Sequence, residues 1–286
     1  MTTAALFLHV GREEAVSTGR DVARWLLDRG VGVVASADEL SLLDVEDCSL
    51  DGDGRTVDIV ISVGGDGTML RAARRAVAAD AELLGINLGR LGYLAEVEPG
   101  AWEAALDTYL AGGHSVTERM LVSTSAFPAD RGTGDPVELP PGLNEIVIEK
   151  LAMGRTVELS VAIDGQHFTT YHADGIIIAT PTGSTAYSLS ARGPVVAPSH
   201  RALVVTAVSP HSLFDRSLVL EPSSVVEVAV CSDRIAAVAV DGEHQMDLRP
   251  GSRVRVTADE RPARFVTFGD RNFHQILKAK FGLSER

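Results

Sequence analysis

The sequence predicts a two-domain protein, with an α/β domain over residues 1–115 (a parallel sheet with helices) and an all-β, sandwich-like domain over residues 116–265. The first observation behind this prediction is an alternation of β-branched runs and helical stretches in the first part. The second is a change of pattern near residue 115, after which short β-rich runs follow one another between turn residues. A C-terminal helix within residues 266–286 is expected to pack back on the first domain.

Apolar spacing predicts the elements of the first domain. The most informative element is the β-branched run 57–63, because it ends in glycines and opens into the helical stretch 69–77. The predicted order is strand 4–10, helix 13–29, strand 31–35, strand 57–63, helix 69–77, strand 81–87 and helix 102–110.

The second domain is predicted from short strands separated by turns. Asp164-Gly165 and Asp241-Gly242 are typical of tight β-hairpins. Residues 129–142, rich in Gly and Pro, are predicted to form a loop, and an apolar stripe predicts a short helix over residues 272–281. The strand-like runs are 116–127, 145–149, 156–163, 167–171, 175–180, 203–208, 225–230, 235–240 and 254–257.

Composition places the chain of 286 residues among ordinary globular proteins, with 45% hydrophobic and 23% charged residues. The formal net charge of −13 argues against a broad nucleic-acid or anionic-membrane surface, so any phosphate must be held by local geometry. Cys48 and Cys231 lack ligand spacing and are interpreted as free thiols of a cytoplasmic protein. The apolar start has no basic segment and predicts a first strand rather than a signal peptide. No run approaches the ~18 apolar residues of a membrane span.

A glycine-rich turn with the sequence GGDGT, residues 64–68, joins the strand 57–63 to the helix that follows. Glycines let a phosphoryl group approach the backbone, and a helix start offers unpaired N–H groups. In open α/β sheets, ligands bind beyond the carboxyl ends of the strands, where this turn is expected. Asp66 suits a site that also accepts a proton from an attacking hydroxyl. The structural alternative is that Asp66 or Thr68 only caps the helix.

A second polar run occupies residues 174–190, where a strand of isoleucines leads into the sequence TPTGSTAY at residues 180–187. The run has many small side chains that donate hydrogen bonds, which suits a surface that binds a polar ligand through backbone and hydroxyl groups. The structural alternative is a loop followed by a helix that begins near Ser184 or Thr185.

Taken together, these motifs closely resemble those of the NAD kinases. The matching runs, in that family's order and spacing, are GGDGT, Asn144-Glu145 and DGIIIATPTGSTAYSLS at 174–190, together with residues 85–94 and 209–213. Diacylglycerol kinases, sphingosine kinases and 6-phosphofructokinases carry similar glycine–aspartate turns on related α/β domains, and the TPTGSTAY run separates this chain from them. The resemblance covers residue 55 to the end, and more weakly the residues before it.

The resemblance implies an enzyme that moves the terminal phosphoryl of ATP, or of inorganic polyphosphate, to the 2′-hydroxyl of the adenosine ribose of NAD, giving NADP. A divalent metal, normally Mg²⁺, would accompany the donor, and no metal site held by the protein alone is expected. The family's architecture implies that NAD binds between the two domains. The implied state is a cytoplasmic homo-oligomer, a dimer or tetramer, without nucleic-acid or membrane partners.

The resemblance also assigns roles to residues of the motifs. Asp66 is the predicted general base, and Arg71 is predicted to reach a donor phosphate, with a solvated helix-face cation as the alternative. Asp174 is assigned to the nicotinamide half of NAD. Close approach of donor phosphates is assigned to Gly64, Gly65 and Gly67. The other predicted NAD contacts are Asn144, Glu145, Thr185, Ala186, Tyr187, Ser188, Leu189 and Ser190, with Arg155 and Gln245 from a looser match.

Two departures from the family's pattern bear on the prediction. The family commonly has two glycines where this chain has Arg192-Gly193, and we expect Arg192 to point outward. His172 stands where members differ, which bears on the use of NADH. Two alternative functions remain: a lipid or sugar kinase that shares the glycine turn, although the chain lacks an amphipathic basic segment, and a non-catalytic nucleotide-binding sensor.

Overall fold

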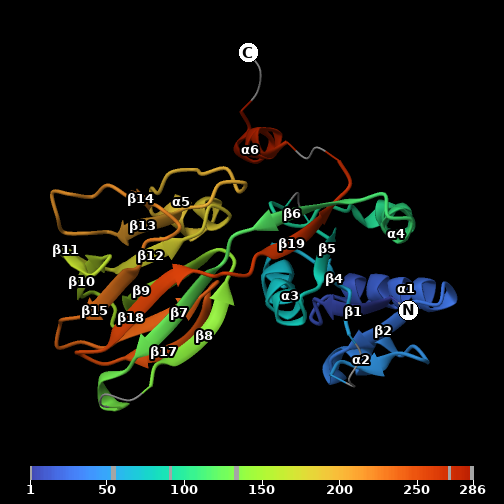
Figure 1. Cartoon of the computed structure of the whole chain (residues 1–286), viewed down its shortest axis with the longest axis horizontal. Coiled ribbons are helices and arrows are strands. Elements are labelled where there is room, and N and C mark those ends of the chain that lie inside the picture. The colour runs from blue at the N-terminus through green and yellow to red at the C-terminus, as the bar shows by residue number, and fades with distance from the viewer. Residues whose placement is uncertain (1, 53–55, 90–91, 132–134, 270–271, 284–286) are drawn as a thin grey trace. The chain divides into compact units, whose positions relative to one another are not determined.

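The computed structural model describes residues 2–52, 56–89, 92–131, 135–269 and 272–283 (Figure 1). Its chain forms two compact units, Met1–Glu118 with Ala263–Arg286, and Arg119–Pro262. The C-terminal segment therefore groups with the first unit rather than with the strands that precede it in the sequence.

The first unit is built on one seven-stranded sheet in the order β3-β2-β1-β4-β5-β19-β6. All neighbouring pairs from β3 through β19 run parallel. Strands of this kind are buried on both faces, which explains their continuous apolar runs. The strands are β1 (Thr3–Leu8), β2 (Gly32–Ala35), β3 (Ser49–Leu50), β4 (Ile59–Gly64), β5 (Glu82–Asn87), β6 (Ser115–Arg119) and β19 (Ala263–Thr267).

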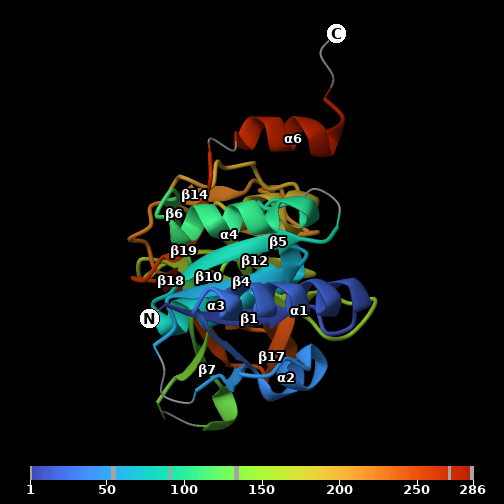
Figure 2. The ribbon, with the colours of Figure 1, turned by 90° about the vertical axis from the view of Figure 1, so that its right-hand side faces the viewer.

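Helices cover both faces of this sheet. On one face α1 packs against β1, β2 and β4 (Figure 2), and Gly19 lets it approach Leu8 of β1 closely. On the other face Gly85 of β5 lies against Met69 of α3. The helices are α1 (Glu13–Asp28), α2 (Ala37–Leu43), α3 (Asp66–Ala79), α4 (Trp102–Leu110) and α6 (Phe273–Phe281), with a 3-10 turn η1 (Pro99–Ala101).

The strand order of the first unit reverses beside β1. The chain passes from β1 outward to β2 and β3, and then returns to place β4 on the other side of β1. The connections after β1 and β4 therefore leave the carboxyl edge of the sheet toward opposite faces. Open α/β sheets bind their ligands at such a switch point.

The second unit consists of two six-stranded antiparallel sheets, in the orders β11-β10-β15-β18-β7-β8 and β14-β13-β12-β9-β16-β17. Apolar side chains from both sheets form one buried core, which includes Leu159 and Val254 of the first and Ile146 and Ile176 of the second. The strands are β7 (Val122–Phe127), β8 (Val137–Gly142), β9 (Glu145–Lys150), β10 (Val157–Ile163), β11 (Gln166–Ala173), β12 (Gly175–Ala179), β13 (Leu203–Val208), β14 (Leu218–Leu220), β15 (Val226–Val230), β16 (Ala236–Val240), β17 (Glu243–Leu248) and β18 (Arg253–Ala258). The helical turns are η2 (Ala129–Arg131), η3 (Gly183–Thr185) and α5 (Tyr187–Ser190).

These features confirm the predicted fold class, a parallel α/β domain followed by an antiparallel sandwich. Both predicted hairpins are present. Asp164 and Gly165 have φ of 51° and 77° between β10 and β11, and Asp241 and Gly242 have φ of 49° and 79° between β16 and β17. Two successive positive φ values match the right-handed twist of the flanking strands.

Two local predictions were wrong, and one helix was missed. Residues 137–142, predicted as part of a loop, form β8, where Pro140 and Pro141 are tolerated because β8 is an edge strand. The run 116–127 is two strands of different sheets, β6 and β7, interrupted at residues 120–121. Helix α2 was missed, although Ser36 and Glu39 form a capping box that the sequence carries.

Candidate functional site

The carboxyl edge of β1, β4 and β5 gathers three chain segments of the first unit. The N–H of His9 donates to the carbonyl oxygen of Val63 at 3.0 Å, and the N–H of Leu88 donates to that of Gly64 at 2.9 Å. Arg12 Nη1 donates to the carbonyl oxygen of Leu88 at 3.1 Å. The segments after the three strands are therefore fixed against one another around the glycine turn.

Helix α3 starts inside the glycine turn, with Gly65 as its N-cap and no side-chain cap. Among the described residues, none accepts a hydrogen bond from the amides of Gly65, Asp66 or Gly67. A Cβ at Gly65 or Gly67 would meet open space, whereas one at Gly64 would overlap Thr68. Gly65 and Gly67 thus leave unpaired N–H groups open to an anion at the positive end of α3, while Gly64 is required for packing.

Asp66 faces a second loop rather than capping its own helix. Its Oδ2 accepts the N–H of Tyr93 at 2.9 Å and its Oδ1 accepts that of Leu94 at 3.2 Å. A side chain at Gly92 would overlap Asp66 Oδ1. The alternative that Asp66 or Thr68 caps α3 is therefore wrong, because Asp66 binds this loop and the buried Thr68 hydroxyl has no hydrogen-bond partner among the described residues. Residues 90 and 91, within the family-like run 85–94, lie outside the described residues.

Arg71 and two residues that sequence reasoning missed lie on the same unit. Arg71 is exposed on the first turns of α3, with its guanidinium carbon 5.5 Å from the centre of the Phe7 ring. His9 and Arg12 follow β1 directly, and His9 Nδ1 is buried without a hydrogen bond among the described residues. Their position after a predicted parallel strand was the signal that could have singled them out.

In the second unit, the start of β9 is held by the turn between β16 and β17. The carboxylate of Asp241 accepts the N–H groups of Leu143 at 2.9 Å, Asn144 at 2.7 Å and Glu145 at 3.1 Å. The hairpin aspartate therefore shapes the Asn144-Glu145 motif, a role that the sequence did not indicate.

Glu145 is a buried carboxylate, with 5% of its surface exposed. Burial, and then the nearby charge of Asp241, raise its pKa to about 8, while the N–H of Tyr187 opposes the rise by donating a hydrogen bond to it. Its Oε2 is buried without a partner among the described residues. A buried carboxyl with a free oxygen is able to bind a ligand hydroxyl.

The TPTGSTAY run folds against Asn144. The N–H of Thr180 donates to the Asn144 carbonyl oxygen at 2.8 Å. The hydroxyl of Thr180 donates to the Leu143 carbonyl oxygen at 2.6 Å and accepts the N–H of Gly183 at 3.1 Å. A Cβ at Gly183 would overlap the backbone of Asn144, so only glycine fits there. The run and the Asn144-Glu145 motif, 37 residues apart at the Thr180–Leu143 bond, form one structure.

Tyr187 lies among the acidic groups of this structure. Burial and the charges of Glu149, Asp174 and Glu145 raise its pKa, yet 38% of its surface is exposed. Its ring is therefore available to a ligand while its amide holds Glu145.

The other predicted contacts in this run differ in exposure. Ser188 is buried and its hydroxyl faces that of Thr206 at 3.4 Å. The hydroxyl of Thr185 donates to the Thr182 carbonyl oxygen at 3.2 Å. Ala186 and Leu189 are half-buried and Ser190 is exposed.

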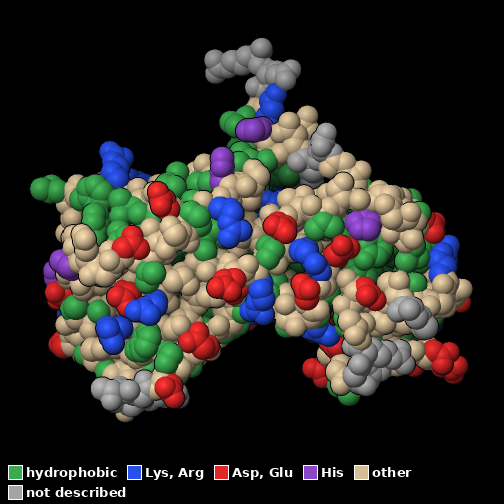
Figure 3. All heavy atoms as spheres, in the orientation of Figure 1, with side chains coloured by type: hydrophobic (Ala, Val, Ile, Leu, Met, Phe, Trp, Pro, Cys, Tyr) green, Lys and Arg blue, Asp and Glu red, His purple; other side chains and the backbone are tan. Residues whose placement is uncertain are grey.

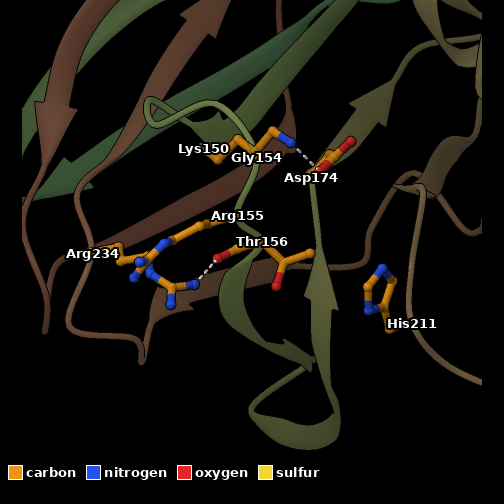
Figure 4. A pocket seen from close by; sticks show the side chains of 7 residues that line it. All are labelled: Lys150, Gly154, Arg155, Thr156, Asp174, His211 and Arg234. Carbon is orange, nitrogen blue, oxygen red and sulfur yellow. Dashed lines mark hydrogen bonds and ion pairs between the residues drawn. The ribbon is translucent and has the colours of Figure 1, made fainter.

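Asp174 and Arg155 line a cavity of about 430 Å³ in the second unit, together with Lys150, Gly154, Thr156, His211 and Arg234 (Figure 4). Lys150 Nζ lies 2.5 Å from Asp174 Oδ1. Gln245 lies apart on the edge strand β17, where its amide nitrogen donates to the carbonyl oxygen of Glu243 in the same strand. The structure thus brings Asp174 and Arg155 together, and leaves Gln245 bound to its own strand.

Arg192, which departs from the family's pattern, has a backbone conformation that is unfavourable for a residue other than glycine. Arg192 is exposed, as expected, and its φ of 67° lies in the left-handed region that favours glycine. Gly193 has no room for a side chain, since a Cβ would overlap the Ser188 hydroxyl. His172 is exposed on β11, and its carbonyl oxygen accepts the N–H of His211 at 2.8 Å.

Similar solved structures share this fold. A yeast NADH kinase complexed with NADH superposes with a TM-score of 0.90 at 22% identity, covering 100% of this chain and 89% of that chain. An NAD kinase from Archaeoglobus fulgidus in complex with ATP superposes with a TM-score of 0.71 at 24% identity, covering 99% of this chain and 98% of that chain.

Sequence comparisons extend this likeness. Residues 5–114 match the ATP-NAD kinase N-terminal domain and residues 143–268 match the ATP-NAD kinase C-terminal domain. An NAD kinase of Syntrophotalea carbinolica is 33% identical over 291 residues, which is 100% of both chains. NAD kinase 2 of Streptomyces avermitilis is 38% identical, over 98% of this chain and 94% of its own length. The chain therefore belongs to the ATP-NAD kinase family.

Proposed function

We propose that the protein is an NAD kinase, which transfers the terminal phosphoryl of ATP to the 2′-hydroxyl of the adenosine ribose of NAD and so forms NADP. The observation that carries the proposal is the position of Asp66 at the switch point of the parallel sheet. There one carboxylate stands beside the open amides of the α3 N-terminus. A base and an electropositive phosphate cradle are the two parts that phosphoryl transfer to a hydroxyl requires.

The donor's phosphates would lie against the amides of Gly65 and Gly67. These N–H groups and the dipole of α3 would offset the negative charge of the phosphates, with Arg71 one turn further along the helix. This local cradle matters in a chain of net charge −13, and Figure 3 shows acidic and basic side chains interspersed over the visible face.

Mg²⁺ would enter with the donor. Within the described ranges of the chain, no three His, Cys, Asp or Glu side chains gather into a metal site. Mg²⁺ usually keeps several waters and binds through substrate phosphates and one or two carboxylates. When bound, the ion would neutralise charge on the donor's phosphates.

Asp66 would accept the proton of the attacking 2′-hydroxyl. Each of its oxygens accepts one backbone N–H, and a carboxylate offers about four lone-pair sites, so each oxygen retains capacity for the hydroxyl. The two N–H groups fix the orientation of the carboxylate. Because phosphoryl transfer depends largely on positioning, this orientation would contribute more than basicity does.

NAD would be held in the second unit by the structure that joins Asn144-Glu145 to the TPTGSTAY run. The free oxygen of Glu145 and the amide of Asn144 would bind ribose hydroxyls or the adenine edge, and the exposed ring of Tyr187 would lie against the adenosine. The remaining predicted contacts, Thr185, Ala186, Ser188, Leu189, Ser190 and Gln245, would complete the adenosine side. Asp174 and Arg155 would contact the nicotinamide half.

The proposal also includes the domain bounds, the location in the cell and the oligomeric state. The functional domains would be residues 1–115, with the helix in 266–286, and residues 116–265. The protein would act in the cytoplasm as a homo-oligomer, a dimer or tetramer. An exposed apolar patch of Leu213, Phe214 and Phe168, whose two phenylalanine rings pack edge to face at 5.9 Å, suits a contact between copies. In the described part of the chain, no helix has the length and apolarity that a membrane crossing needs.

The decisive experiment measures NADP formation by the purified protein with ATP, Mg²⁺ and NAD. Parallel reactions replace ATP by polyphosphate and NAD by NADH, and a further set offers a diacylglycerol or a sugar phosphate as acceptor. Formation of NADP supports the proposal, and formation of NADPH from NADH extends it. Phosphorylation of only the lipid or sugar would replace it by the first alternative function. Binding of NAD without turnover on any donor would favour a nucleotide sensor.

A further inference from the structure

The C-terminal segment of the chain contacts the loop that holds Asp66. The N–H of Phe268, which follows β19, donates to Glu96 Oε1 at 3.1 Å. Lys280 of α6 has its Nζ 4.2 Å from the centre of the Tyr93 ring. Tyr93 is also the residue whose N–H donates to Asp66 Oδ2 at 2.9 Å. Residues 93–96 therefore bind both the carboxylate of Asp66 and the C-terminal segment.

Both ends of α6 are closed by local structure, which fixes where Lys280 lies. Asn272 caps the start of the helix, where its side-chain oxygen accepts the N–H two residues further on at 2.9 Å. At the other end Gly282 has a φ of 60°, and the N–H of Leu283 donates to the carbonyl oxygen of Lys278 at 3.0 Å. The last turn, which carries Lys280, is therefore closed by a hydrogen bond.

The charge of Lys280 lies against an aromatic ring instead of a carboxylate. Lys280 is exposed, and no acidic side chain in the described ranges forms an ion pair with its Nζ. A cation within about 6 Å of a ring centre is attracted by the negative face of the ring. Burial, and then the charge of Asp66, raise the pKa of Tyr93, so the ring lies within the field of that carboxylate. A cation and the carboxylate thus act on the same aromatic side chain.

We propose that Lys280 is a positioning residue of the phosphoryl-transfer site, because its ammonium group holds the Tyr93 ring and so keeps the Tyr93 N–H aimed at Asp66. Two hydrogen bonds from the loop orient the Asp66 carboxylate, and Lys280 restricts the motion of the residue that donates one of them. The effect on catalysis rests on the proposed function, in which Asp66 accepts the proton of the 2′-hydroxyl. The structural alternative is that Lys280 only stabilises α6, as a basic residue in its last turn.

The first test compares Lys280→Gln with the unmodified protein. Loss of a cation–ring contact changes an equilibrium by about two- to fivefold, so the amides of Tyr93 and Leu94 should exchange hydrogen about two- to fivefold faster in NMR spectra. The kcat for NADP formation should fall by a similar factor, while KM for NAD and ATP stays unchanged. Lys280→Arg keeps a cation for the ring and should restore both values. Arg24→Gln, which removes the charge of an exposed side chain of α1 in the same unit, is the control and should change neither.

A double-mutant cycle with Tyr93→Leu separates the proposal from the alternative. This variant keeps the backbone N–H and removes the aromatic ring, so adding Lys280→Gln to it should change kcat and exchange no further. Three results would overturn the proposal: unchanged kcat or unchanged exchange at residues 93–94 in Lys280→Gln, an equal effect of this change with and without the Tyr93 ring, or faster exchange confined to residues 273–281. Failure of the unmodified protein to form NADP would instead overturn the proposed function, and exchange at residues 93–94 would still decide whether Lys280 holds the loop.

Discussion

The two candidate sites of this protein are built in opposite ways. At the carboxyl edge of the parallel sheet, binding groups come from the backbone, and the single carboxylate, Asp66, accepts two N–H groups. In the antiparallel unit the binding groups are side chains, and two acids, Glu145 and Asp241, lie close together in a buried setting. The first arrangement suits phosphate groups and the second suits the hydroxyls and amide edges of a nucleoside.

The two sites therefore differ in the substitutions to which they are sensitive. The N–H groups of the first site belong to the backbone and are kept in every substitution except one by proline, so that site is most sensitive at Asp66 and at the glycines that admit no side chain. The second site is sensitive to changes of charge, because burial raises the free-energy cost of ionising its carboxyl groups.

The largest effect is expected for Asp66→Asn. An amide is unable to take the proton of the 2′-hydroxyl, so kcat should fall by roughly 10²- to 10⁴-fold, with KM for NAD little changed. The measurement is steady-state NADP formation. Asp21→Asn, an exposed aspartate of α1, is the matched control.

Asp66→Asn also loses one of the two loop bonds, which costs about 0.5–1.5 kcal/mol of folding stability. Thermal unfolding measured beside the kinetics therefore separates the two roles. Full kcat with a lowered Tm would make Asp66 a residue that only holds the loop at 93–94.

The second prediction concerns pH and Glu145. Its pKa is about 8 in the folded protein and near 4.5 when unfolded, so the folded state binds more protons between these values. Stability should therefore fall as pH rises from 5 to 8.5, by a few kcal/mol, on the order of 3–5, if Glu145 alone acts. Denaturant unfolding across this range measures the slope.

Glu145→Gln removes this titration while keeping an acceptor for the Tyr187 N–H, so its stability should vary less with pH. Glu149→Gln, a half-buried glutamate of the same strand, is the control and should keep the native slope. Equal slopes in the native protein and Glu145→Gln would show that Glu145 does not titrate in this window.

Gly183→Ala is expected to destabilise the second unit by about 1–3 kcal/mol, because the added methyl overlaps the backbone of Asn144. The displaced Asn144-Glu145 motif should raise KM for NAD as well. Calorimetry and NAD titration measure the two effects. Gly100→Ala is the control, since a Cβ there meets open space, and a similar loss in both variants would refute the close approach.

The smallest effect is expected for Arg192→Gly. A non-glycine residue at φ of 67° costs about 1–2 kcal/mol, and the extra entropy that glycine loses on folding offsets about 0.5–1 kcal/mol of the gain. The variant should be more stable by up to about 1 kcal/mol, measured by urea unfolding. Arg192→Ala keeps the Cβ and should not gain stability.

More of the first site than of the second could be predicted from the sequence. The strand–turn–helix of residues 57–77 was predictable, because apolar periodicity and glycines act locally, and the position of the turn at a carboxyl edge followed from the fold class. The partner of Asp66 was not predictable, since the N–H groups of Tyr93 and Leu94 come from a loop 27 and 28 residues further on. Arg155 and Asp174 were singled out only by resemblance, and Lys150 and Arg234, which complete their cavity, not at all.

By itself, the sequence determined the two-domain fold class, the hairpins at Asp164 and Asp241, and the motifs that identify the family. These follow from periodicity, turn chemistry and residue order, which are properties of short stretches. Tertiary structure alone decided that Asp66 binds a loop instead of capping its helix, and that Asp241 shapes the Asn144-Glu145 motif and raises the pKa of Glu145. Such effects depend on burial and on charges brought together from distant residues, and no local pattern encodes either.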